Sequence, residues 1–216
     1  MSKQIVISKS NNSSTMDAII HPIGLELKAL GYRASSRIFN RNQPDGIIHV
    51  VHFQMGLRWS IRGRFTIEIG IFVPEVYEAF FGKVTPKFIP SYFCEERERL
   101  GVLGKKNEDI WWELSGSEKN VIHEILKLLL DDGERYLAQF GTREKLLSQY
   151  EQERQRKALS QRKILMMAII LTHLGKKGQA KDLLNQEFGG QYRTSFLEYA
   201  YNIVAPLRIT FFMRNE

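Results

Sequence analysis

Two segments with a period of two constrain the fold of this chain most. Phe65–Val73 carries a large apolar residue at every second position, and Ile47–Gln54 shows the same alternation earlier in the chain. Successive side chains of a β-strand point to opposite faces of the sheet, so this spacing is typical of strands and not of helices. We therefore predict that a sheet organises the first half of the chain, with Phe65–Val73 buried on one side.

The chain is long enough to form its own core. It has 216 residues, of which 43% are hydrophobic, and a chain of this size buries roughly 70% of its unfolded surface on folding. The single cysteine, Cys94, excludes an internal disulfide and any zinc site built from several cysteines. The longest apolar run, Ile164–Leu171, has eight residues, whereas a membrane-spanning helix needs about 20. Because Met1–Gln4 also lacks the apolar stretch of a signal peptide, we expect a cytoplasmic protein.

Helical spacing flanks the sheet and dominates the second half. Apolar residues recur at helical spacing in Met16–Leu30 and Glu118–Phe140, and further strands are predicted at 33–41, Cys94–Leu100 and Ile110–Leu114. We predict an α+β fold in which residues 1–140 form an antiparallel sheet of about four or five strands covered by these helices. Residues 141–216 are predicted to form a helical C-terminal extension packed on that domain, and its last part, Leu207–Met213, is predicted as a strand or a further helical piece.

Basic residues are concentrated in two segments, while the net charge of the whole chain is +7. Residues 33–64 contain six arginines and one acid, and residues 154–181 contain eight basic residues and no acid. Clustered basic charge is found on surfaces that bind nucleic acids, and it is also found on solvated faces with long extended side chains. These two basic segments give nucleic-acid binding as the alternative function.

The polar loop 57–64 is the best candidate for a contact surface. It combines Trp59 with three arginines, Arg58, Arg62 and Arg64. Tryptophan and arginine are enriched in protein-interface hot spots and in grooves that bind single-stranded nucleic acids. The other interpretation is a hairpin loop whose tryptophan packs back onto the sheet. On a strand Trp111 and Trp112 face opposite ways, so one belongs to the core and the other, for which we choose Trp112, is a further binding candidate.

Three polar residues of the predicted sheet form a second candidate site, a cleft lined by His52, Glu68 and Arg97. An enzymatic interpretation requires these side chains to converge on a concave pocket with perturbed pKa values, and it fails if they lie on opposite faces. His49 and His52 are three residues apart on a strand and point to opposite faces. We therefore predict that both histidines have local partners in the sheet and that there is no metal site.

No catalytic motif assembles elsewhere in the sequence. Gly101–Lys106 lacks the spacing and the hydroxyl group of a phosphate-binding loop, and no Gly-x-Ser-x-Gly motif is present. Glutamate and arginine alternate in residues 96–99, which predicts an edge strand whose arginines pair with neighbouring acids such as Glu68 or Glu113. The sequence therefore favours a protein with no catalytic residues, no cofactor and no enzymatic activity.

Several motifs occur in an order that resembles a known family. They are Gly31-Tyr32, Arg37–Arg41, His49–Gln54, Phe65–Ile71, Cys94 with Arg97–Gly101, and Trp111–Leu114. Over roughly residues 16–140 this ordered set resembles the domain of unknown function 4304 family, whose members are mostly bacterial. The resemblance implies a small α+β domain with no assigned activity, and no catalytic residue can be carried over from it.

From these observations we predict a non-enzymatic protein-binding module. Its expected partner is another protein, nucleic acid is the alternative partner, and no membrane is involved. A role in neutralising a toxin, as an immunity-like protein, or in phage conflict is compatible with the bacterial distribution that the resemblance implies.

Overall fold

The computed structural model describes residues 2–115, 118–189 and 194–208, and the chain divides into two compact units. Residues 1–72 and 86–141 form the first unit, and residues 73–85 and 142–216 form the second. The segment 73–85 belongs with the later helices because it contains α2 (Pro74–Phe81), which contacts α7 (Gln161–His173) and α9 (Thr194–Val204).

The first unit is built on an antiparallel sheet, as the sequence predicts. The strands are β1 (Arg33–Ser35), β2 (Ile38–Asn42), β3 (Ile48–Met55), β4 (Arg64–Phe72), β5 (Glu96–Arg99) and β6 (Trp112–Glu113). They follow the order β1-β2-β3-β4-β5, and the short strand β6 also pairs with β4. The longest ladder joins β3 to β4, from Ile48 opposite Phe72 to Met55 opposite Phe65. The two alternating segments of the sequence are therefore the centre of the sheet.

Strand β4 differs from the prediction because it is buried on both faces. The apolar residues of its first face are fully buried, as the alternation predicts: Phe65, Ile67, Ile69 and Ile71. On the second face the returning chain covers the strand. Thr66 donates a hydrogen bond to the carbonyl oxygen of Ile110, and Cys94 lies so close to Gly70 that a Cβ at Gly70 would be 2.9 Å from its sulfur. Only the tertiary path of residues 91–110 decides that this second face is covered.

The predicted strand at 33–41 is a hairpin of two short strands instead. Ser35 of β1 pairs with Ile38 of β2, and Ser36 between them has a positive φ of 53°. Two-residue hairpin turns require φ in this left-handed region, which glycine and asparagine usually supply. The sequence did not show the reversal because serine occupies the position.

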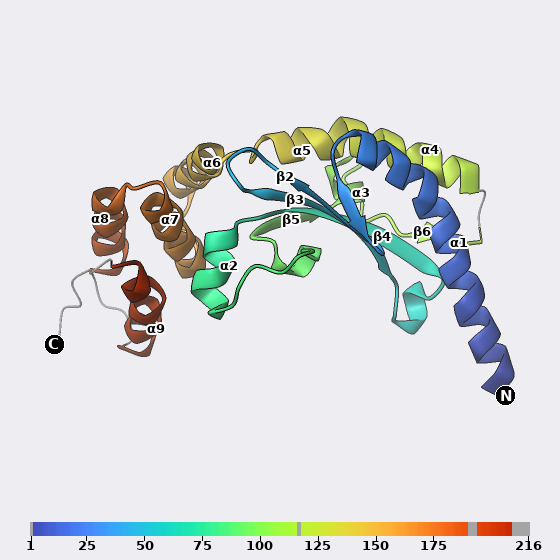
Figure 1. Ribbon diagram of the computed structural model, residues 1–216, viewed down its shortest axis with the longest axis horizontal. Helices are drawn as coiled ribbons and strands as arrows, with labels where there is room; N and C mark the ends of the chain where they lie inside the picture. The colour runs from blue at the N-terminus through green and yellow to red at the C-terminus, as the bar shows by residue number, and fades with distance from the viewer. Residues whose placement is uncertain (1, 116–117, 190–193, 209–216) are drawn as a thin grey trace. The chain divides into compact units, whose positions relative to one another are not determined.

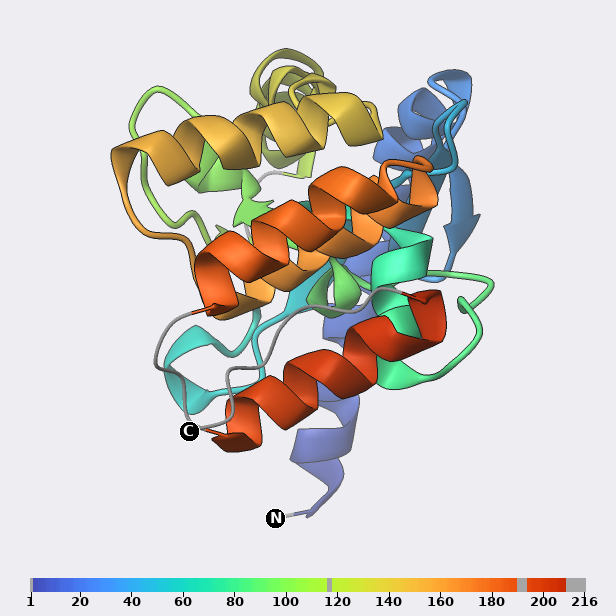
Figure 2. The ribbon, with the colours of Figure 1, turned by 90° about the vertical axis from the view of Figure 1, so that its left-hand side faces the viewer.

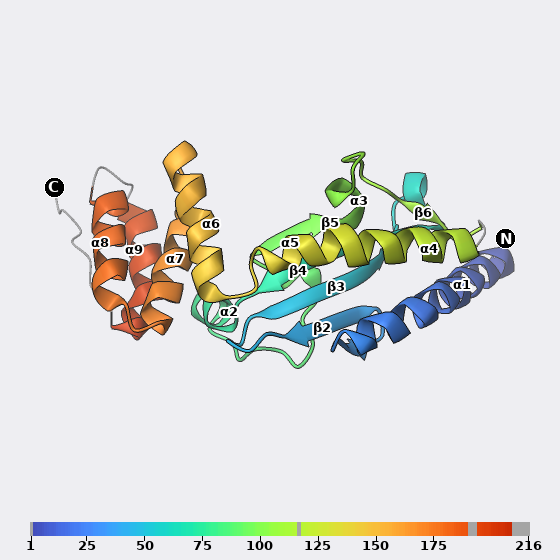
Figure 3. The same cartoon turned by 90° about the horizontal axis from the view of Figure 1, so that it is seen from above.

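Helices cover one face of the sheet (Figure 1). Helix α1 (Ser2–Ala29) places Gly24 against the ring of Phe39 on β2, and α5 (Glu134–Ala138) contacts β4. Between α4 (Glu118–Leu128) and α5 lies a π-helical turn, η3 (Leu129–Gly133). Figure 3 shows these helices from above, lying along the sheet. The two predicted covering helices are thus present.

The helical boundaries differ from the expected ones. Helix α1 begins at Ser2 and includes Pro22, whereas the sequence predicts a start at Met16. In the second helical stretch, a Cβ at Gly133 would lie 3.3 Å from Leu100 and 3.6 Å from Ile69. The glycine therefore lets the π-helical turn approach the sheet closely.

The second unit is helical. Besides α2, α7 and α9 it contains α6 (Arg143–Arg156) and α8 (Lys177–Phe188). Helix α7 is its centre and contacts α2, α6, α8 and α9 (Figure 2). The side chains of Thr142 and Ser160 cap α6 and α7 by accepting hydrogen bonds from backbone N–H groups. The burial of seven consecutive residues of α7, from Ile164 to Ile170, follows from its position among four helices.

The remaining elements are short: η1 (Trp59–Ile61), η2 (Ser91–Phe93), α3 (Leu100–Leu103) and η4 (Ala205–Leu207). The predicted strand or helical piece at Leu207–Met213 lies mostly outside the described residues. In the part of the chain that the structure describes, every helix is too short or too polar to cross a membrane.

Candidate functional site

The sheet face opposite the helices carries an open pocket of about 570 Å³, and His52, Glu68 and Arg97 all line it. His52 lies opposite Glu68 in the β3–β4 ladder, and Arg97 lies opposite Gly70 in the β4–β5 ladder. Residues that are paired, or two positions from a paired residue, share a face of the sheet. The three residues of the predicted cleft therefore come together on one face. A volume of this size is within the range of small-molecule sites.

Hydrogen bonds hold the polar floor of this pocket. Glu68 Oε2 accepts one from Ser91 Oγ at 2.7 Å and one from Gln54 Nε2 at 2.9 Å. His52 Nδ1 lies 3.0 Å from the same Ser91 oxygen. Burial lowers the pKa of His52, and the nearby Glu68 carboxylate opposes this effect only in part. The imidazole is therefore neutral near pH 7.

The segment that carries Ser91 is fixed to the sheet at a second point. The side-chain amide of Asn40 donates to the carbonyl oxygen of Ile89 at 3.0 Å and accepts from its N–H at 2.7 Å. Asn40 is buried and Ser91 has no exposed surface. Ser91 therefore positions Glu68 and His52, and it is not accessible as a nucleophile.

The sequence identified His52, Glu68 and Arg97 as residues of this pocket, but not Arg37 or the serine that holds Glu68. Gln54 follows His52 by two positions on β3, and the period of two was a sufficient signal to place both on one face. Ser91 and Tyr92 also contribute to the site. They come from a proline-containing loop with no periodicity, so no local signal could have placed them there.

The two arginines of β5 have different surroundings. Arg99 forms an ion pair with Asp109 and lies 5.0 Å from the ring centre of Trp111, so Asp109 takes the place that the sequence suggested for Glu68 or Glu113. Arg97 belongs to the β4–β5 ladder, but its side chain is exposed and, within the described residues, forms no ion pair or side-chain hydrogen bond. The guanidinium group of Arg97 is therefore available at the pocket.

Loop 57–64 projects its apolar residues into solvent. Trp59 is 86% exposed and Leu57 92% exposed, which contradicts the interpretation in which the tryptophan packs back onto the sheet. The guanidinium carbon of Arg62 lies 5.9 Å from the Trp59 ring centre. A Cβ at Gly56 would lie 2.1 Å from the carbonyl oxygen of Ile61, so glycine is needed where the loop closes.

Two other predicted binding residues are engaged within the first unit. Arg64 pairs with Glu113 at 2.8 Å. Trp112 is 4% exposed, and its indole N–H donates to Glu124 at 3.1 Å. Trp112 is therefore the core member of the tryptophan pair, because it packs against Phe65 on the first face of the sheet.

Acidic side chains from elsewhere offset much of the charge in the two basic segments. In residues 33–64, besides Arg64, Arg37 pairs with Asp17 and Arg41 with Glu134. In residues 154–181 the pairs are Arg154 with Glu151 and Glu187, and Lys157 and Lys163 with Glu153. Six of the fourteen basic residues in the two segments are therefore paired with acidic side chains that lie outside those segments.

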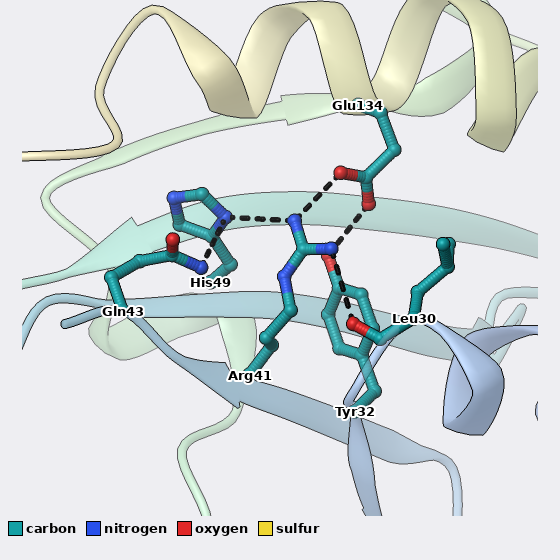
Figure 4. Close-up of polar contacts among 6 residues, drawn as sticks. All are labelled: Leu30, Tyr32, Arg41, Gln43, His49 and Glu134. Carbon is teal, nitrogen blue, oxygen red and sulfur yellow. Dashed lines mark hydrogen bonds and ion pairs between the residues drawn. The ribbon is translucent and has the colours of Figure 1, made fainter.

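A buried polar cluster lies on the helix-covered face of the sheet (Figure 4). Arg41 donates to Glu134 at 2.6 Å, and its Nη2 lies 3.2 Å from Nδ1 of His49. The Tyr32 hydroxyl donates to the other oxygen of Glu134. Burial first, and the Arg41 charge second, lower the pKa of His49 to about 4. The cluster ties β2, β3 and Tyr32, which precedes β1, to α5, so we assign it a structural role.

The described residues contain no group of three or more His, Cys, Asp or Glu side chains that could hold a metal ion. Cys94 is a free cysteine, and burial raises the pKa of its thiol. A protonated thiol packed against Gly70 is typical of a structural cysteine.

Comparison with known proteins gives one family. The family model described as "Domain of unknown function (DUF4304)" matches residues 23–139, which is more than half of the chain and includes the sheet, the pocket and loop 57–64. No curated protein and no solved structure matches the chain.

Proposed function

The chain belongs to the domain of unknown function 4304 family, whose description assigns no activity, and we propose that this protein is a non-enzymatic module that binds another protein through loop 57–64. The exposure of Trp59 carries the proposal. A tryptophan side chain that is 86% exposed gains nothing from folding, whereas burial against a partner makes tryptophan one of the strongest contributors to interface energy.

The neighbours of Trp59 suit an interface with an acidic protein surface. Leu57 adds a second exposed apolar side chain. Arg58 and Arg62 are exposed, and no acid of the described residues pairs with either of them. Paired with carboxylates of a partner, these arginines would orient the complex and accelerate association.

A neutralising role in bacterial conflict, against a toxin or a phage protein, is the biological setting that we propose for this module. Its support is the bacterial distribution that the resemblance to this family implies, and the surface chemistry is compatible with an acidic target. The genes adjacent to this one test the setting: a neighbouring toxin or defence gene is expected, and unrelated neighbours would count against it.

Nucleic-acid binding remains the alternative proposal, and the ion pairs weigh against it. A phosphate backbone needs several unpaired cations along its path, and the described ion pairs engage six of the fourteen basic residues of the two segments with acidic side chains. The alternative predicts oligonucleotide binding that weakens steeply between low and moderate salt.

Co-purification from the native host tests the main proposal. The tagged chain is compared with Trp59→Ala and with Leu25→Ala, which removes another exposed apolar side chain. We expect a protein partner with the unmodified chain and with Leu25→Ala, and its loss with Trp59→Ala. A partner retained by Trp59→Ala, or a chain that purifies alone, would contradict the proposal. Salt-sensitive oligonucleotide binding would replace it with the alternative.

A further inference from the structure

The pocket on the open sheet face presents two opposite charges that do not neutralise each other. Glu68 and Arg97 both line it, and they form no ion pair with each other, although Arg97 lies on the neighbouring strand. Diagonal cross-strand residues have backbones about 7–8 Å apart, which long side chains can span. The hydrogen bonds from Gln54 and Ser91 hold the carboxylate in its present position.

Both charged groups have unused bonding capacity. Within the described residues, every hydrogen bond to Glu68 goes to Oε2, so Oε1 is left for a ligand. The Arg97 guanidinium has five N–H donors and no partner among the described side chains. The remaining cation of the lining, Arg37, is paired with Asp17.

The rest of the pocket provides shape and apolar contact. Ile38, Leu57 and Tyr92 line it, and Leu57 and Tyr92 are 92% and 62% exposed, so both side chains are accessible to a ligand. The floor is preorganised, because Ser91 is buried and its segment is held to β2 by the two hydrogen bonds of Asn40. A preorganised polar pair beside apolar walls is the usual composition of a small-ligand site.

We propose that this pocket binds a free α-amino acid with an apolar side chain. The ammonium group of the ligand pairs with Glu68, its carboxylate pairs with Arg97, and its side chain packs against Tyr92 and Leu57. A zwitterion suits the site because its two charged groups can pair with Glu68 and Arg97 at once. A simple cation would pair only with Glu68 and a simple anion only with Arg97, so the other side chain would be left without an oppositely charged partner.

Isothermal titration calorimetry of the full chain tests the site, with L-phenylalanine and L-leucine as probes up to about 10 mM, where ligands of this size bind at ordinary efficiency. N-acetyl-L-phenylalanine, which lacks the ammonium group, and L-phenylalanine amide, which lacks the carboxylate, are the matched ligands. We expect at least one free amino acid to bind and each matched ligand to bind at least about tenfold more weakly.

Two variants test which side chain binds the ammonium group of the ligand and which binds its carboxylate. Glu68→Gln is expected to remove the preference for the free ammonium group, and Arg97→Gln the preference for the free carboxylate. Arg99→Gln is the control, because Arg99 pairs with Asp109 outside the pocket lining, and it should leave the affinity unchanged. Arg97 is exposed, so Arg97→Gln keeps the test decisive even if Glu68→Gln does not fold.

Two results would overturn the site: no heat of binding with either amino acid, or equal affinity for the free and blocked ligands. The inference does not rest on protein binding through Trp59. Trp59→Ala should retain amino-acid binding, and Arg97→Gln should retain the protein partner, so failure of one proposal is distinguishable from failure of the other.

Discussion

Acid should destabilise the first unit through one buried histidine. His49 is 2% exposed, and its pKa falls from an ordinary value of 6.5 to about 4 because of burial and the Arg41 charge. Between these two pH values the unfolded chain binds a proton that the folded chain excludes. The contribution of His49 to the free energy of unfolding is therefore complete above pH 6.5 and is lost as the pH falls toward 4.

The size of the effect follows from the two pKa values. Each pH unit between them contributes about 1.4 kcal/mol, so the whole interval corresponds to about 3 kcal/mol and the part above pH 5 to about 2 kcal/mol. A loss of that size is a large fraction of the 5–15 kcal/mol, roughly, that stabilises a typical domain. Protonated His49 would also place a second cation beside Arg41.

Urea unfolding followed by tryptophan fluorescence measures this loss in the relevant unit, since Trp59, Trp111 and Trp112 all lie in residues 1–141. The comparison is between pH 7.5 and pH 5.0. His49→Asn keeps an acceptor for Arg41 and removes the titrating group. Between pH 7.5 and pH 5.0 the free energy of unfolding of this variant should therefore fall by about 2 kcal/mol less than that of the unmodified chain.

The control is His123→Asn, which replaces an exposed histidine of α4 in the same unit. It should keep the pH dependence of the unmodified chain. If His49→Asn and the unmodified chain lose the same stability between the two pH values, His49 is not the group responsible, and the account of the buried cluster is refuted.

Three further substitutions test the fold and the proposed surface. Arg143→Met removes the bidentate partner of the Glu75 carboxylate in the second unit, whose two contacts are 2.7 Å long. It should lower the free energy of unfolding by about 3 kcal/mol or more, as measured by urea unfolding followed by circular dichroism. The double variant Arg143→Met/Glu75→Leu should recover most of that loss. Gly70→Ala places a Cβ 2.9 Å from a backbone oxygen and from Cys94 and should cost about 1–3 kcal/mol in the same assay, so an unchanged midpoint would contradict the packing. Trp59→Ala should change stability by less than about 0.5 kcal/mol, and a larger loss would show that the exposed tryptophan supports the fold.

Residue periodicity predicted which segments form strands and helices better than it predicted where those elements end and which distant residues they contact. The alternation of Phe65–Val73 gave β4 and its buried first face, because side-chain direction in a strand depends only on position parity. It could not give the burial of Thr66 on the second face, since that depends on where residues 91–110 return. The start of α1 at Ser2 was missed because the residues before Met16 lack an apolar stripe.

The candidate site shows the same division. Parity placed His52 and Glu68 on one face, opposite His49, and composition identified loop 57–64 as unusual. That Trp59 faces solvent is a property of the folded loop, which no pattern in the sequence indicates. That Ser91 holds Glu68 depends on a hydrogen bond between residues 23 positions apart, for which the sequence carries no local signal.

The sequence by itself determined what short-range geometry controls: a strand-rich first half, a helical second half, and the face to which each side chain of a strand points. The tertiary structure alone decided which charges are neutralised, because ion pairs such as Arg41 with Glu134 join distant segments. It also decided that Arg97 and Glu68 share an open pocket without pairing. Coulombic and hydrogen-bonding contacts act over a few ångströms of space irrespective of separation along the chain, and no count of charges along a sequence can supply those distances.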